Sequence, residues 1–160
     1  MDKIDLPFLT ASQLSRLIET KEVSPVAATE AYLDRIQEVD SKLNSYITVT
    51  GEQALEAARQ AEQEIAQGNH RGPLHGVPVA VKDQFNTAGI RTTGGSSILK
   101  DFVADEDATV MANLKKAGAV LLGKLNMSEF AMAEIYHHPY GTPRNPWDLE
   151  RKPGTSSSGS

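Results

Sequence analysis

One lysine stands at the end of an apolar run, where an amine can do chemistry. In "GVPVAVKDQ" (residues 76–84) the run leads to Lys82 and then to Asp83. We expect a buried strand here, and in an α/β sheet the carboxyl ends of strands face the ligand crevice. Burial disfavours the ammonium and lowers the pKa of a lysine, so that its neutral amine can act as a base. Lys82 is therefore a candidate catalytic base, although a surface lysine paired with Asp83 fits the same position.

A second lysine occupies a similar position. Lys124 follows the apolar run "AVLLG" of residues 119–123. A place at the end of a strand therefore does not by itself distinguish a catalytic lysine from a structural one.

Two clusters of small and hydroxyl-bearing residues are further candidates for a site, "RTTGGSS" (91–97) and "GTSSSGS" (154–160). Small residues let a backbone approach a ligand closely, and hydroxyls both donate and accept hydrogen bonds. The second cluster lacks the Gly-Lys-Ser/Thr ending of a P-loop. Taken alone, the first cluster fits a surface loop and the second a flexible linker.

The remaining polar clusters do not predict a metal centre. His137 and His138 are adjacent, so their side chains point apart, and no third ligand follows at a suitable spacing. The acidic residues 105–107 fit the start of a helix, where carboxylates face the positive end of the dipole. The 160 residues contain no cysteine, which excludes a thiolate zinc site or a cysteine nucleophile within them.

The first 70 residues are predicted to be mostly helical. Thr10 begins a capping-box pattern, and Ser24-Pro25 is the usual N-cap and first-turn pair of a second helix. The other elements expected in this segment are a short strand at 45–49 and a helix over 52–67.

From residue 71 onward, strands and glycine-containing loops are predicted. The runs 77–82 and 119–123 are buried strands, and a helix that begins near Asp107 and ends at Gly118 lies between them. This order indicates a parallel crossover. The predicted elements that follow are a short helix over 128–134 and an extended connection over 140–154.

These elements predict an α/β fold, with the helical segment 1–70 packed on a mostly parallel or mixed sheet from 71–160, all within a single domain. Two clear strands do not make a stable sheet alone. We therefore expect the chain to be the N-terminal part of a larger domain that is incomplete at residue 160.

Composition and charge narrow the function class. The net charge of −5 and the pI of about 5.4 argue against a nucleic-acid surface on this segment, because such surfaces need a basic excess. The N-terminus lacks a secretory signal pattern, and no apolar run approaches the roughly 20 residues of a membrane span. We expect a cytoplasmic protein without membrane contact.

Three stretches together resemble the amidase signature family: "GPLHGVPVAVKDQFNTAGIRTTGGSS", "DEDATVMANLKKAGAVLLGKLNMSEFAM" and "YGTPRNPWDLERKPGTSSSGS". Their order is specific, although each piece alone is weak, and the resemblance covers roughly residues 10–160. It implies a mixed α/β core, no metal or organic cofactor, and hydrolysis of a carbon–nitrogen amide bond by a Ser–Ser–Lys triad.

The resemblance also implies roles for individual residues. The family's strand-end lysine matches Lys82 rather than Lys124. Its P-G-G-S-S-G-G-S pattern corresponds to "PGTSSSGS", which makes Ser156 the bridging serine and Ser157 a supporting residue. Thr155 and Ser158 replace glycines, so positive φ angles are restricted at both positions. The substrate-binding candidates, which would line an acyl pocket, are Ala131 and Met132.

The attacking serine is expected beyond residue 160, so this segment alone should be inactive. The resemblance implies a small-molecule amide as substrate. An equally similar class is the A subunit of glutamyl-tRNA(Gln) or aspartyl-tRNA(Asn) amidotransferase, which releases ammonia from glutamine and works with partner subunits. A non-catalytic α/β binding module that ends in a linker is the alternative from another class.

Overall fold

The helices and strands of the chain follow the predicted order. The computed structural model describes residues 3–132, 137–154 and 156–160. Its helices are the 3₁₀ helix η1 (Lys3–Phe8), α1 (Ala11–Glu19), α2 (Pro25–Leu43), α3 (Gly51–Ala66), α4 (Thr109–Lys116) and the 3₁₀ helix η2 (Glu129–Ala131). Its strands are β1 (Tyr46–Val49), β2 (Pro78–Lys82) and β3 (Val120–Leu125). None of these helices combines the length and the apolar composition that a bilayer crossing requires.

Both predicted helix starts are confirmed by their hydrogen bonds. The backbone N–H of Gln13 donates to Thr10 Oγ1 at 3.3 Å, and the Thr10 N–H donates to Gln13 Oε1 at 2.9 Å, which completes the capping box. The Ser24 hydroxyl accepts the N–H of Ala27 at 3.0 Å, and Pro25 is the first residue of α2. Local side chains therefore fix where α1 and α2 begin.

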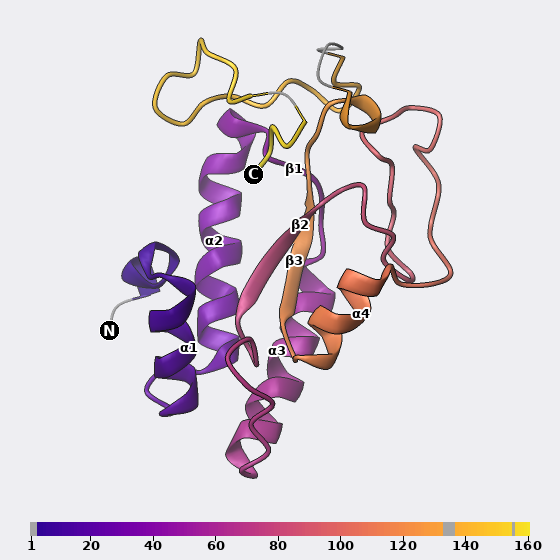
Figure 1. The fold of residues 1–160 in the computed structure, drawn as a ribbon. Coiled ribbons are helices and arrows are strands. Elements are labelled where there is room, and N and C mark those ends of the chain that lie inside the picture. Colours follow the sequence, from indigo (N-terminus) through magenta and orange to yellow (C-terminus); the bar gives the residue numbers. More distant parts are fainter. Residues whose placement is uncertain (1–2, 133–136, 155) are drawn as a thin grey trace. The chain divides into compact units, whose positions relative to one another are not determined.

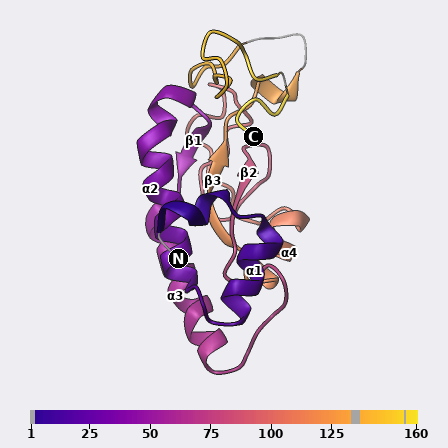
Figure 2. The ribbon, with the colours of Figure 1, turned by 90° about the vertical axis from the view of Figure 1, so that its left-hand side faces the viewer.

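The sheet is mixed, and Figure 2 shows its strands in the order β1, β3, β2. Strand β1 is antiparallel to β3, with Tyr46 opposite Leu125. Hydrogen bonds join Val120 to Val77 at 2.9 Å and Asp83 to Leu125 at 3.0 Å, so β2 and β3 run parallel. The predicted crossover through α4 is confirmed. Strand β3 is longer than the predicted run 119–123, and it includes Lys124.

Two compact units make up the chain and alternate along the sequence. Unit 1 contains residues 1–38, 50–79 and 113–122, and unit 2 contains 39–49, 80–112 and 123–160. In unit 1, the helices α1, α2 and α3, which Figure 1 labels, contribute residues to two apolar clusters. Their buried members are Leu6, Leu14, Ile18, Val23, Ala28, Ala31, Ile65 and Val77 in one, and Ala54, Ala58, Val120 and Leu122 in the other.

In unit 2, the segment that carries the serines is fixed by its backbone. The Gly159 N–H donates to the Asn126 carbonyl at 2.9 Å, and the Asn126 N–H donates to the Ser45 carbonyl at 2.7 Å. A Cβ at position 159 would lie 2.3 Å from that Ser45 oxygen, so only glycine permits this approach. Residues 156–160 are therefore attached at the end of β3 and do not form the free linker that composition alone suggested.

The predicted short helix over 128–134 is confirmed only in part, as a shorter helix of a different type. The structure has the one-turn helix η2 instead, in which Phe130 has a φ of 48° and Ala131 a φ of 61°. A regular right-handed helix does not accommodate these left-handed values. Residues 133–136 lie outside the described part of the chain.

Candidate active site

The structure brings Lys82 and Ser156 together within unit 2. Lys82 is the last residue of β2, and Ser156 lies in the segment attached at the end of β3. Lys82 Nζ donates a hydrogen bond to Ser156 Oγ at 2.7 Å, across 74 residues of sequence. Both residues are half-buried. An amine and a hydroxyl at this distance can exchange a proton directly.

Burial lowers the pKa of Lys82 below its ordinary value. Desolvation penalises the ammonium, and no opposite charge offsets the penalty. Among the described residues, no carboxylate forms an ion pair with Lys82, and Ser156 provides its hydrogen bond. The environment therefore favours the neutral amine that a general base requires.

The carboxylate next to Lys82 in the sequence pairs with the other lysine. Asp83 Oδ1 lies 3.2 Å from Lys124 Nζ, and both side chains are fully buried. Lys124 also donates to the Phe85 carbonyl and to Thr92 Oγ1, each at 2.8 Å. The surface pairing of Lys82 with Asp83, the alternative that the sequence left open, is wrong because Asp83 points into this buried network.

Ser157 and Ser158 differ from Ser156 in their surroundings. Ser157 is exposed, and no described residue forms a hydrogen bond with its hydroxyl. Ser158 is buried, and its Oγ lies 3.1 Å from His138 Nε2. Sequence reasoning missed this pair, because nothing in the spacing of residues 138 and 158 indicates a contact. Thr155, the first replaced glycine, lies outside the described residues.

A cavity of about 210 Å³ lies in the same unit. Met127, which follows β3, and Phe130 of η2 contribute to its wall, whereas Ala131 is half-buried and Met132 is exposed, and neither lines it. The full lining is Gln84, Asn86, Thr92, Gly94, Leu99, Phe102, Met127 and Phe130. Its mixture of apolar side chains with two primary amides suits a small amide or acyl group.

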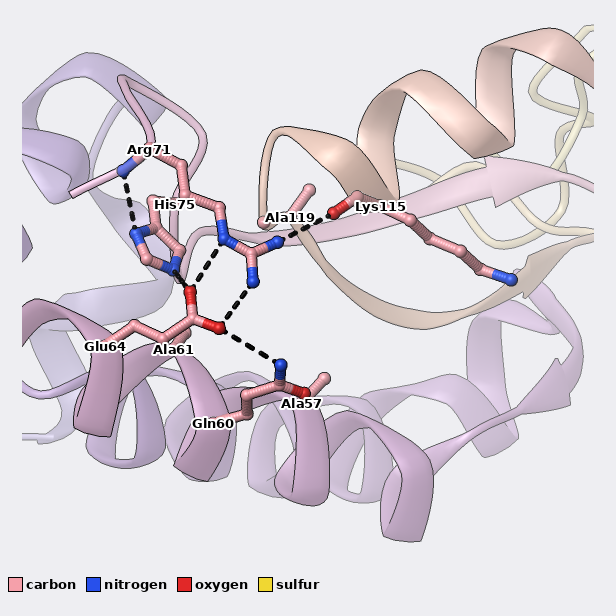
Figure 3. Close-up of a pocket in the computed structure, with 9 residues that line it drawn as sticks. Ala57, Gln60, Ala61, Glu64, Arg71, His75, Lys115 and Ala119 are labelled. Carbon is pink, nitrogen blue, oxygen red and sulfur yellow. Dashed lines mark hydrogen bonds and ion pairs between the residues drawn. The ribbon is translucent and has the colours of Figure 1, made fainter. Parts of the chain in front are cut away.

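A second polar cluster lies in unit 1, around a pocket of about 240 Å³ (Figure 3). Arg71 donates to both carboxylate oxygens of Glu64, at 2.7 and 2.5 Å. The Arg71 N–H donates to His75 Nδ1 at 3.1 Å, so the proton of the buried imidazole sits on Nε2, 3.1 Å from Glu64 Oε2. Glu64 and Arg71 neutralise each other in this cluster, which is typical of a structural network rather than of a reactive site.

The described residues contain no group of three or more His, Cys, Asp or Glu side chains that could hold a metal ion.

Comparison with known proteins agrees with this arrangement. Residues 27–160 match the family described as Amidase. The chain is 52% identical over 157 residues to the A subunit of glutamyl-tRNA(Gln) amidotransferase from Moorella thermoacetica, covering 98% of this chain and 32% of that protein. It is 55% identical over 153 residues to the protein of that name from Geobacter sp. strain M21, covering 95% and 31%.

Solved structures give the same result. The native peptide amidase from Stenotrophomonas maltophilia matches with a TM-score of 0.89 and 34% identity, covering 97% of this chain and 34% of that one. An amidase family protein from Bacillus anthracis matches with a TM-score of 0.87 and 37% identity, covering 99% and 34%. The chain spans about a third of the length of the curated relatives it matches. On these findings, the chain belongs to the amidase family.

Proposed function

We propose that the full-length protein that carries this segment hydrolyses a carbon–nitrogen amide bond, with Lys82 as general base and Ser156 as the bridging hydroxyl. The observation that carries the proposal is the 2.7 Å contact between Lys82 Nζ and Ser156 Oγ, on a lysine whose neighbour in the chain, Asp83, pairs with Lys124 instead. Family membership supports the reaction class. Ser157 is proposed to support the loop, and Ala131 and Met132 to contact the acyl group.

In the proposed mechanism, each proton that is removed is accepted by a named group. The neutral amine of Lys82 accepts the proton of Ser156, and Ser156 accepts the proton of the attacking serine that the resemblance places beyond residue 160. The new serine–carbon bond forms as the carbonyl π bond opens. The proton then passes from Lys82 through Ser156 to the leaving nitrogen, and the carbonyl π bond re-forms as the carbon–nitrogen bond breaks. Water then hydrolyses the acyl-enzyme by the same relay. As proposed, these steps use no metal and no organic cofactor.

Activity of the full-length protein tests this proposal. Ammonia release from small amides is compared among the natural protein, Lys82→Ala, Ser156→Ala and the control Ser41→Ala, an exposed serine of α2 outside the proposed site. We expect Lys82→Ala and Ser156→Ala each to lose at least about 10²–10⁴-fold in kcat, since general-base catalysis is of that size. Ser41→Ala should keep the natural activity. Near-natural rates in either of the first two variants would remove the relay.

The relatives favour one specific substrate, which gives a second candidate function. The curated proteins named above, at 52% and 55% identity, are A subunits of glutamyl-tRNA(Gln) amidotransferase. We propose on this ground that glutamine is the amide donor and that partner subunits receive the ammonia, which places the protein in the cytoplasm with charged tRNA. Direct nucleic-acid binding by this acidic segment is not part of the proposal.

Purification under native conditions separates the two candidates. Co-purification of two further subunits, with ATP-dependent amidation of Glu-tRNA, supports the amidotransferase role. Hydrolysis of varied amides by the isolated protein, without partners, supports a free amidase acting on small molecules. A protein that does neither would favour the non-catalytic module.

A further inference from the structure

Lys82 and Lys124 lie in neighbouring parallel strands, and one carboxylate lies beside them. Asp83 directly follows Lys82 in the chain, yet its Oδ1 lies 3.2 Å from Lys124 Nζ. An opposite charge within about 4–6 Å of a lysine favours the ammonium. The lysine that pairs with Asp83 is therefore the one whose charged form is favoured.

Three contacts hold the Asp83 carboxylate in place. Besides the Lys124 ammonium, the backbone N–H of Thr93 donates to Asp83 Oδ2 at 2.8 Å, and the Thr93 hydroxyl donates to the same oxygen. Asp83, Thr93 and Lys124 are all fully buried. The Asp83 N–H also donates to the Leu125 carbonyl at 3.0 Å, which aligns the residue with β3.

Lys124 is itself tied by uncharged acceptors, the Phe85 carbonyl and Thr92 Oγ1. Burial lowers the pKa of Lys124, whereas the charge and hydrogen bonding of Asp83 raise it. Burial also lowers the pKa of Lys82, and no carboxylate opposes that effect. The pKa of both lysines is thus lowered by burial, and the pairing with Asp83, which opposes this effect, is present at Lys124 alone.

We infer that Lys124 is a positioning residue for the amidase reaction: by holding the Asp83 carboxylate inside the sheet, it leaves the Lys82 amine facing the Ser156 hydroxyl alone. The inference rests on the proposed function, because it concerns the same amine. Lys124 touches neither Ser156 nor a reacting atom, so it acts through Asp83.

No other acid among the described residues of unit 2 pairs with Lys82. Asp83 follows Lys82 directly in the chain but pairs with Lys124 of β3, and the side-chain hydrogen bond of Lys82 among the described residues is with Ser156 of the C-terminal segment. Other acids of this unit have partners of their own: Asp40 accepts the N–H groups of Ser45 and Tyr46, Asp107 that of Ala88, and Glu129 the hydroxyl of Ser96.

The titration of Lys82 in the full-length protein tests the inference directly. Lysines are reductively methylated with a ¹³C label, and the Lys82 resonance is identified by its absence in Lys82→Arg. In Lys124→Met the Asp83 carboxylate loses the ammonium that neutralises it, and we expect its negative charge to raise the titration midpoint of Lys82 by about one pH unit or more. In the double variant Lys124→Met with Asp83→Asn the midpoint should return to the natural value, because no carboxylate remains.

Kinetics give the same test through activity. The rising limb of kcat/KM against pH should move upward in Lys124→Met, with about a tenfold loss on its acid side for each pH unit that the limb moves. A lower kcat with an unmoved limb, or a double variant shifted as far as the single one, would overturn the inference and leave Lys124 a structural residue. Where Lys124→Met fails to fold, Thr93→Val should give a smaller shift in the same direction, and Thr93→Ser none. An unmoved Thr93→Val would then overturn the inference.

The two readouts separate this inference from the proposed function. If the natural protein hydrolyses no amide, but the titration midpoint of Lys82 still rises in Lys124→Met, the proposed function is wrong and the inference about the Lys124–Asp83 pair stands. If the natural protein is active and Lys82→Ala is not, but the titration midpoint of Lys82 does not change in Lys124→Met, the proposed function stands and the inference is wrong.

Discussion

The Lys82 site of unit 2 and the Glu64 cluster of unit 1 are both groups of polar side chains, but they differ in how their charges are satisfied. Glu64 and Arg71 form an ion pair, the Arg71 backbone N–H donates to His75 Nδ1, and His75 Nε2 lies 3.1 Å from Glu64 Oε2. Lys82 has a hydroxyl in place of a carboxylate. A paired cluster keeps its protonation state and holds the chain together, whereas an unpaired buried amine is free to change its protonation state.

Lys124 shows that burial alone does not give a lysine that changes its protonation state easily. It is more deeply buried than Lys82, yet its contact with Asp83 opposes the loss of its charge. The difference between the two lysines should therefore appear as a difference in stability as well as in chemistry.

The largest expected effect is on the free energy of unfolding. Lys124→Met should destabilise the full-length protein by about 3–5 kcal/mol, because it leaves the Asp83 carboxylate buried without its partner. The matched variant Lys82→Met should change stability by less than about 1 kcal/mol, since a half-buried amine and one hydroxyl contact are replaced by an apolar chain of similar length. Urea denaturation measures both. Equal losses in the two variants would break the comparison.

That difference between the lysines is the part of the site that sequence patterns do not contain. Lys82 and Lys124 both follow apolar runs, and only the family resemblance selected Lys82. Asp83 is adjacent to Lys82 in the chain, but its partner is set by the parallel register of β2 and β3 and by the loop that brings Thr93 back to it. Such contacts between distant residues leave no local periodicity.

Local signals, by contrast, predicted most of the fold. The Thr10 capping box and the Ser24-Pro25 start are interactions between near neighbours in the chain, so the sequence contains them completely. The sequence "SEFAM" has helical composition and does form the short helix η2, but the left-handed φ values at Phe130 and Ala131, which stop it from continuing as a regular helix, depend on tertiary contacts. One of these is the Phe130 N–H, which donates to the Gly94 carbonyl at 2.8 Å.

A smaller effect is expected where the packing of the paired cluster is disturbed. A Cβ on Gly118 would lie 2.3 Å from His75 Cδ2, and Gly118 has a φ of +78°, so Gly118→Ala must both strain the backbone and displace the imidazole. We expect a loss of about 2–3 kcal/mol. Gly68→Ala is the matched control, because Gly68 has a φ of +86° with nothing within 4 Å of the added Cβ. It should cost only about 1 kcal/mol. Similar losses in thermal or urea denaturation would show that His75 yields freely.

The smallest effect is the pH dependence that the paired cluster contributes to stability. Desolvation lowers the pKa of His75, which Glu64 partly opposes, and the hydrogen bond from Arg71 lowers the pKa of Glu64. The unfolded chain therefore binds more protons than the folded one at both positions. The contribution of His75 is complete above its ordinary pKa near 6.5 and is lost as the pH falls below it, and that of Glu64 is lost below about 4.5.

Between about pH 7 and 5 the slope from His75 cannot exceed about 1.4 kcal/mol per pH unit, the limit for one proton. His75→Gln, which cannot ionise, should flatten this part of the curve of unfolding free energy against pH, whatever its effect at neutral pH. The exposed control His137→Gln should leave the slope unchanged. A slope that persists in His75→Gln would mean that the acid sensitivity arises outside the Glu64 cluster. A flattened slope would identify the cluster as a set of groups whose protonation is tied to folding, in contrast to the amine of Lys82.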